Sequence, residues 1–244
     1  MNRFIFLLLG IFSSLFSPSV AQKYTYLGTN KLYYGASYYP ESWPASNLAE
    51  DIKQMKAANI NVVRMAEFSW SKMEPEEGVY TFEWLHNIIE ALHKNGIDVI
   101  LGTPSATPPA WLWEKYPEIA NVRDNGFVEI HGARRNTNYT NELWRKKATG
   151  IAEKMAVEFG NKPGVIGWQI DNELGLYADY SEHTRKRWIE YLRTKYGSIE
   201  NLNQLWATDL WSQTYQRFEQ IPMPVSQIWH HNSLRFEWSR FTSL

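Results

Sequence analysis

The chain has 244 residues, 44% of them hydrophobic, and a formal net charge of −1, values that suit one large domain or two small ones. No basic surplus points to a nucleic-acid partner, and the lack of cysteine excludes a disulfide framework, a thiol nucleophile and a cysteine zinc site. Twelve Trp and fourteen Tyr supply many aromatic faces, which support sugar rings in some proteins and are ordinary core in others.

The first residues have the three parts of a signal peptide. Arg3 gives a positive start, residues 4–16 are apolar but too short for a membrane span, and Ser19-Val20-Ala21 is a small-residue cleavage site. We therefore predict a signal peptide over residues 1–21 and a mature chain that begins at Gln22. The mature protein is then periplasmic or secreted and does not contact a membrane. The alternative is an uncleaved membrane anchor.

Strand and helix patterns alternate along the rest of the chain. Apolar runs at residues 32–39, 60–66, 97–101 and 164–170 predict four strands. Helical spacing follows Asn47, which forms a potential capping box with Glu50, and also follows Thr81, Asn141 and Ser181. Further helices are predicted at residues 199–206 and 226–244. Alternation of this kind indicates βαβ crossovers and a parallel sheet.

The run at residues 164–170 is apolar on both faces, as in a strand buried on both sides. It ends abruptly in Asp171, Asn172 and Glu173. Polar groups at the carboxyl end of a parallel strand are where α/β barrels place their chemistry. The alternative is that these acids only cap the next helix or form a surface ion pair.

Two further features bear on the architecture. No glycine-rich phosphate loop follows any predicted strand, so a nucleotide-binding fold has no support. Residues 103–138 form a long irregular segment of the kind that is usually functional. The alternative is a surface excursion with a short helix at residues 111–115. Four strands are half of the eight that an α/β barrel needs, so we expect residues 22–244 to be the N-terminal half of such a barrel.

The polar residues at the strand ends suit the cleavage of a glycosidic bond. Glu173 is the candidate proton donor, a role that needs a carboxyl whose pKa is raised by burial or a neighbouring charge. Asn172 and Arg134 are candidates to bind sugar hydroxyls. A retaining mechanism needs a second carboxylate about 5 Å away. Glu67 ends the second strand, and we interpret it as a supporting residue rather than that nucleophile.

Several long motifs resemble one family. They are YGASYYPE at residues 34–41, EFSWS at 67–71, EPEEG at 74–78, TPSATPPAWL at 103–112, GWQIDNE at 167–173 and WSQTY at 211–215. In this order they resemble the opening of the glycoside hydrolase family 42 β-galactosidases, over nearly the whole predicted mature chain. The resemblance implies a (β/α)8 TIM barrel of the retaining glycosidase clan, with only its first four β/α units present here.

The resemblance also implies an activity and roles for residues. The reaction is retaining hydrolysis of terminal non-reducing β-D-galactose from β-galactosides. Glu173 corresponds to the family's acid/base, Asn172 and Arg134 to sugar ligands, and Trp211 to a substrate-side tryptophan. The family's nucleophile lies on the seventh strand, beyond this chain. Family members are typically homotrimers.

One departure from the family concerns metal. Many members hold zinc with four cysteines, and Asn138 stands where the first of them aligns. Glu182 and His183 are nearby, but an acid and a histidine in the first turn of a helix are more often solvated or capping. We expect neither a metal nor a cofactor.

Two other functions stay open at this point. The chain is either the front part of a β-galactosidase, a sugar-binding remnant without catalysis, or part of a related β-glycosidase such as an arabinopyranosidase. A downstream catalytic glutamate separates the first from the second, and substrate profiling separates the first from the third.

Overall fold

The computed structural model describes residues 31–173, 175, 178–229 and 231–243. The predicted signal peptide over residues 1–21 and the cleavage before Gln22 lie outside these residues. The chain divides into two units, Met1–Tyr33 and Tyr34–Leu244, and the architecture below is that of the second unit.

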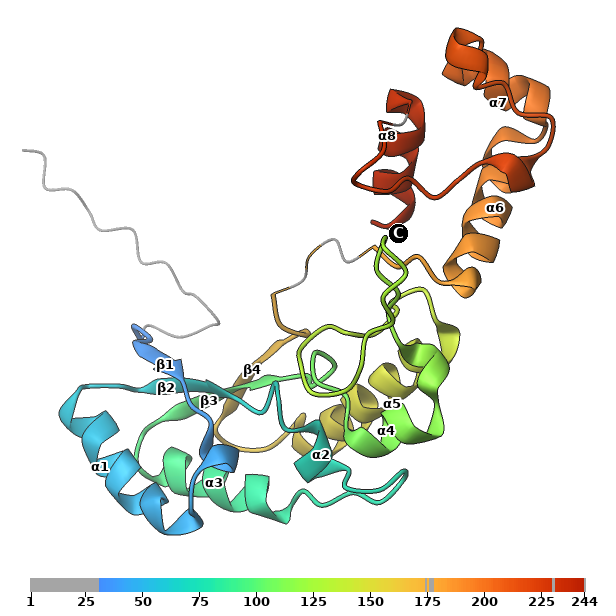
Figure 1. Cartoon of the computed structure of the whole chain (residues 1–244). Coiled ribbons are helices and arrows are strands. Elements are labelled where there is room, and N and C mark those ends of the chain that lie inside the picture. Colours follow the sequence, from blue (N-terminus) through green and yellow to red (C-terminus); the bar gives the residue numbers. More distant parts are fainter. Residues whose placement is uncertain (1–30, 174, 176–177, 230, 244) are drawn as a thin grey trace, which may run out of the picture. The chain divides into compact units, whose positions relative to one another are not determined.

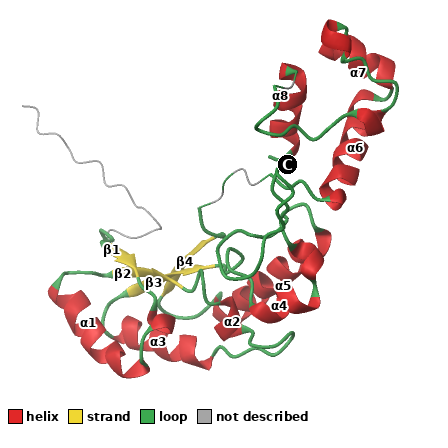
Figure 2. Cartoon of the chain, viewed as in Figure 1, coloured by secondary structure: helices red, strands yellow, loops and turns green. Residues whose placement is uncertain are grey.

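Four parallel strands form one sheet in the order β1-β2-β3-β4 (Figures 1 and 2). The register pairs Val63 with Ala36 on one side and with Val99 on the other, and the ladder is irregular between Val99 and Ile100. All four predicted strands are confirmed. The strands are β1 Gly35–Ser37, β2 Val62–Met65, β3 Asp98–Gly102 and β4 Val165–Gln169.

Helices connect each strand to the next and cover one face of the sheet (Figure 1). They are α1 Leu48–Ala57, α2 Trp70–Met73, α3 Glu83–Lys94, α4 Ala110–Lys115 and α5 Glu142–Phe159, with the 3-10 turns η1 Pro40–Ser42, η2 Ala45–Asn47 and η3 Pro117–Ile119. Alternate strand residues such as Met65 and Leu101 are fully buried in one core with Ile89 of α3 and Met155 of α5. Burial of the amphipathic helix faces against this sheet is the main source of stability.

The helix starts confirm one prediction and contradict another. Helix α5 begins after Asn141 as predicted, and the Asn141 side chain caps it by accepting a hydrogen bond from the Trp144 backbone at 3.0 Å. The capping box at Asn47 is wrong, because Asn47 ends the turn η2 with helical dihedrals of −77° and −19° and makes no capping hydrogen bond. Glu50 binds Lys53 at 3.1 Å instead.

The prediction that β4 is buried on both faces is wrong. All five residues of β4 are only half-buried, and Ile170, which follows it, is 70% exposed. The reason is topological, because β4 is the edge of the described sheet and pairs with β3 alone. Its apolar residues Val165 and Trp168 still pack against the core below the sheet.

A second core follows β4 in the chain. Trp188, Leu202 and Trp238 meet there, with the indole rings of Trp188 and Trp238 edge to face at 5.2 Å. Its elements are α6 Glu182–Tyr196, α7 Ile199–Trp206, η4 Leu210–Ser212, η5 Phe218–Gln220 and α8 Asn232–Phe241.

The ends of these helices follow the sequence with one exception. Ser181 caps α6 as predicted, and α7 spans the predicted residues 199–206. The last helix is shorter than the predicted 226–244, because the His231 side chain caps α8 and Ser226 is held in a turn by Asp124 at 2.6 Å.

The segment over residues 103–138 is ordered rather than structureless. Besides α4 and η3 it contains two antiparallel bridges, Ala120 to Thr137 and Val122 to Val128.

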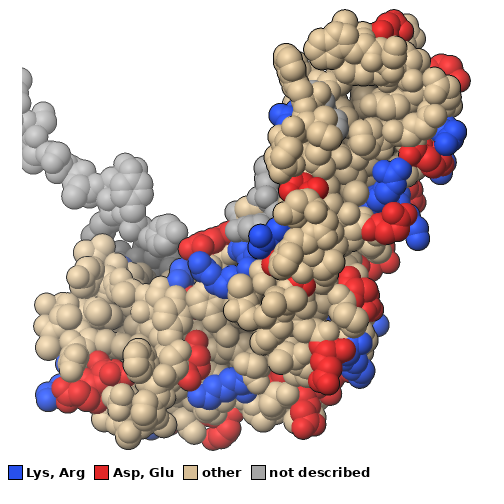
Figure 3. Space-filling model, viewed as in Figure 1, with Lys and Arg blue, Asp and Glu red and all other residues tan. Residues whose placement is uncertain are grey.

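Charges of both signs are interspersed on the face shown in Figure 3. Among the described residues, none of the helices combines the length and the apolar character that crossing a membrane requires.

Candidate active site

The chain leaves β4 through an unusual backbone. Asp171 and Glu173 have φ angles of 56° and 48°, in the left-handed region. This conformation is unfavourable for residues other than glycine, and residues that adopt it are concentrated at functional sites. Hydrogen bonds hold this turn. The Thr103 hydroxyl accepts from the Asp171 amide at 2.7 Å, and the Gln169 side chain donates to the Asp171 carbonyl at 2.7 Å. The end of β4 is therefore fastened to the end of β3.

A buried ion pair ties the long loop to the same turn. Arg135 Nη2 lies 3.2 Å from Asp171 Oδ1, and the two side chains are only 5% and 7% exposed. Arg135 has a φ of 61° and also donates to the Tyr139 hydroxyl at 3.0 Å. No role for Arg135 is predicted from the sequence. Two features of the sequence could have indicated this pair, namely the two consecutive arginines and the acid directly before Asn172.

Arg134 and Glu173 lie close together. Arg134 Nη1 lies 3.5 Å from Glu173 Oε2, beside the pair formed by Arg135 and Asp171. The burial expected for the proton donor is absent, since the Glu173 side chain is 70% exposed. Glu173 follows an edge strand, so no further strand of the described sheet covers it.

Asn172 is almost completely buried, with 3% of its surface exposed. Its Oδ1 accepts from Gln169 at 3.2 Å, whereas its buried Nδ2 has no hydrogen-bond partner among the described residues. An unsatisfied buried amide costs about 1–3 kcal/mol. Such a donor is suited to bind an acceptor brought by a ligand.

Glu67, at the end of β2, exposes none of its surface. Its Oε1 lies 2.8 Å from Arg64 Nη2 and accepts from the Tyr39 hydroxyl at 3.0 Å. A carboxylate buried in this way does not reach a sugar from its present position. The geometry agrees with a supporting role.

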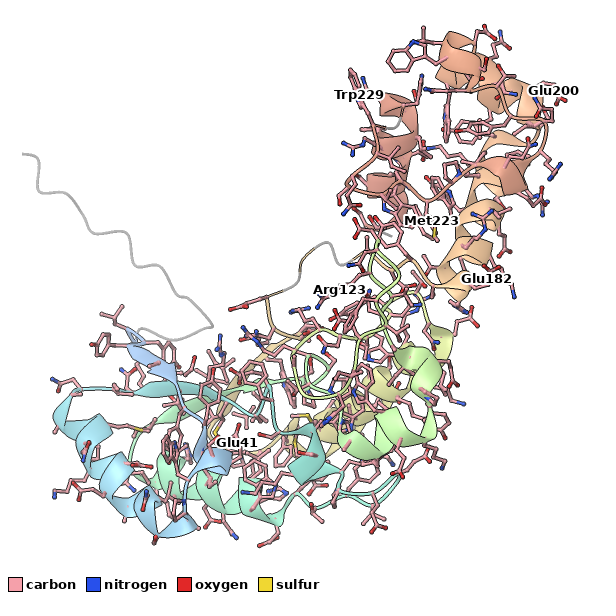
Figure 4. The ribbon with its side chains drawn as sticks, in the orientation of Figure 1. Glu41, Arg123, Glu182, Glu200, Met223 and Trp229 are labelled. Carbon is pink, nitrogen blue, oxygen red and sulfur yellow. The ribbon has the colours of Figure 1, made fainter. Side chains whose placement is uncertain are left out.

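Trp211 lies in the part of the chain that forms the second core. It is 68% exposed, has a φ of 54° inside η4, and packs edge to face at 5.8 Å against Trp229, which is labelled in Figure 4. Among the described residues no hydrogen bond or ring contact joins Trp211 to Arg134, Asn172 or Glu173.

The residues where the family places zinc have other partners. Asn138 is fully buried and donates to Ser181 and Thr184, which fastens the start of α6. His183 contacts the Thr140 carbonyl at 3.1 Å. Within the described ranges, no three His, Asp or Glu side chains lie close enough together to hold a metal ion. The absence of zinc stays a prediction.

Comparison with known proteins settles the family. The model of the family described as glycoside hydrolase 42, β-galactosidase, matches residues 37–244. The chain belongs to glycoside hydrolase family 42. It is 42% identical over 215 residues to the β-galactosidase YesZ of Bacillus subtilis, and 37% identical over 213 residues to the β-galactosidase Bga of Halorubrum lacusprofundi.

Solved structures of this family confirm the fold. The family 42 β-galactosidase Gan42B superimposes with a TM-score of 0.83 at 34% identity over 88% of this chain, and the Halorubrum lacusprofundi enzyme with 0.81 at 36% identity over 87%. The four parallel β/α units are thus part of a TIM barrel, as predicted. The chain spans about a third of these relatives, 32% of YesZ and 32% of the Gan42B chain.

Proposed function

We propose that this family 42 chain supplies the acid/base side of the active site of a retaining β-galactosidase. The observation that carries the proposal is the rim at the end of β4, where Arg134 lies 3.5 Å from Glu173 beside the buried Asn172 with its unused donor. The β-galactosidases YesZ and Bga support the substrate class by similarity.

The proposed roles follow from the chemistry of each group. Asn172 Nδ2 donates a hydrogen bond to a sugar hydroxyl, and Arg134 binds a hydroxyl while it holds the Glu173 carboxyl in place. A carboxylate outside the described residues attacks the anomeric carbon, and the bond to the aglycone oxygen breaks as Glu173 gives that oxygen its proton. Glu173 then takes a proton from water, which displaces the enzyme carboxylate and retains the β configuration.

The proposal extends to the whole protein. Trp211 contributes an aromatic face on the substrate side, and the signal peptide directs the protein to the periplasm or the medium. The complete enzyme is a homotrimer. The 244 residues alone do not hydrolyse substrate, because an acid without a nucleophile cannot start the double displacement.

A chimera tests the activity directly. The chain replaces the matched 215-residue stretch of YesZ, and hydrolysis of an aryl β-galactoside is followed by NMR. We expect turnover with β-galactose as the first product. The aryl α-L-arabinopyranoside serves as the competing substrate, and a preference for it, or α-galactose as the first product, contradicts the proposal. The parent YesZ is the control for folding and assay.

A further inference from the structure

Glu67 is a costly group for the protein to keep. It is a carboxylate with no exposed surface, and only Oε1 has partners, namely Arg64 and Tyr39. Oε2 is buried without a hydrogen bond among the described residues. A half-satisfied buried carboxylate is less favourable than an apolar side chain of the same size, so its presence calls for a role other than stability.

The backbone around Glu67 is built to hold it in one position. Ala66, directly before it, has a φ of 78°, a strained value for alanine. Gly102 at the end of β3 lies so close that a Cβ added there is 2.4 Å from the Glu67 Cβ. The side chain of Glu67 is therefore fixed against the strand that precedes the Arg134 loop.

A chain of contacts leads from Glu67 to the candidate active site. The Tyr39 hydroxyl donates to Glu67 Oε1 at 3.0 Å, and the Tyr39 ring stacks on Phe68 with centroids 5.6 Å apart. The Arg134 guanidinium carbon lies 5.6 Å from the centroid of Phe68. The same guanidinium reaches Glu173 at 3.5 Å.

Among the described residues, the ring of Phe68 is the only aromatic ring that the Arg134 guanidinium contacts, and Glu173 is the only acid with which it forms an ion pair. Arg134 is 53% exposed, so little else restrains its long side chain. An arginine on an aromatic face gains about 0.5–1 kcal/mol at an exposed site, enough to favour one orientation.

We propose that Glu67 is a positioning residue that acts on Arg134 through Tyr39 and Phe68. Its carboxylate fixes the Tyr39 hydroxyl, the Tyr39 ring fixes Phe68, and Phe68 supports the guanidinium that faces Glu173. Glu67 itself does not touch substrate. The inference rests on the proposed function only for its catalytic consequence, because the placement of Arg134 is a property of this chain alone.

The first test reads that placement without any activity. In the 244-residue chain, proton–nitrogen NMR of the arginine side chains reports Arg134, assigned with Arg134→Lys. The Phe68 ring current displaces the Arg134 signal. We expect Glu67→Met, which removes the oxygen that accepts from Tyr39, and Phe68→Leu to move this signal toward the position of a free arginine. An Arg134 signal that stays unchanged in a folded Glu67→Met chain overturns the proposal.

The second test is a double-mutant cycle in the YesZ chimera. We expect Glu67→Met to lower kcat/KM for an aryl β-galactoside on the order of tenfold to a hundredfold, as for a small misplacement near the chemistry. In an Arg134→Ala background the same change should have little further effect, since both act through one group. Equal losses in both backgrounds overturn the proposal.

Glu237→Met is the matched control. Glu237 is also a buried carboxylate, bonded to Tyr191 and Tyr196 in the second core. Its substitution should weaken folding while leaving kcat/KM unchanged. An inactive chimera with all native residues contradicts the proposed function, whereas the NMR result still decides the role of Glu67.

Discussion

Removing one charge of the buried pair between Arg135 and Asp171 should be among the most destabilising single changes in this chain. Asp171→Asn keeps the volume and the hydrogen bonds to Asn172 and Thr103 but removes the negative charge that lies 3.2 Å from the Arg135 guanidinium. At 3.2 Å and an effective dielectric constant near 20, the lost attraction is about 5 kcal/mol. The neutral hydrogen bond that remains offsets about 1 kcal/mol, so we expect a loss of about 4 kcal/mol.

Urea unfolding of the 244-residue chain, followed by far-ultraviolet circular dichroism at 25 °C, measures this loss. Glu50→Gln is the control, because its ion pair with Lys53 is exposed and should contribute less than about 1 kcal/mol. The double variant Arg135→Gln with Asp171→Asn should lose less than Asp171→Asn alone, since both charges of the pair are removed together. Unfolding of Asp171→Asn at the same urea concentration as Glu50→Gln would show that the buried pair does not stabilise the fold.

Three further predictions concern pH, activity and metal. Burial raises the pKa of Glu41, labelled in Figure 4, so its charged form is disfavoured in the folded state. The protonated Glu41 side chain stabilises the fold below its ordinary pKa of 4.5, and this contribution is lost as the pH rises through the raised pKa. Glu41→Gln should therefore stabilise the chain at pH 7 but not at pH 4. Thermal unfolding at both pH values measures the difference. The 244-residue chain alone should release nitrophenol from nitrophenyl β-galactoside no faster than the buffer without protein. Turnover at ordinary enzyme rates would make Glu67 the first candidate nucleophile. Elemental analysis after dialysis should find no stoichiometric zinc, and one equivalent per chain contradicts that prediction.

The sequence predicts the strands well because each is a short apolar run between turns. It also places Arg134 and Glu173 in segments that follow two successive strands, and the carboxyl ends of parallel strands lie at one edge of a sheet. The burial of β4 is not predictable from its residues, because apolar character on both faces does not state whether a further strand is present to cover it. Glu173 is exposed for the same reason, because no further strand of the described sheet lies beside β4.

The supporting residues are harder to see in a sequence. The ion pair of Arg135 with Asp171 joins positions 36 residues apart and depends on left-handed turns at both of them, which no local pattern signals. The buried state of Glu67 likewise depends on contact with Gly102 across the sheet. Asn47 shows the opposite case. The capping pattern is present in the sequence, but Asn47 lies in a 3-10 turn with helical dihedrals and its side chain does not cap the helix.

The acid/base role of Glu173 is tested most directly by how the effect of Glu173→Ala depends on the leaving group of the substrate. In the YesZ chimera this variant should lose most of its activity on lactose, whose leaving oxygen needs a proton, and much less on dinitrophenyl β-galactoside, whose leaving group departs as an anion. Azide should accelerate the variant on the activated substrate and yield β-galactosyl azide, because azide needs no base to replace water. Equal losses on both substrates with no azide product would show that Glu173 is not the acid/base.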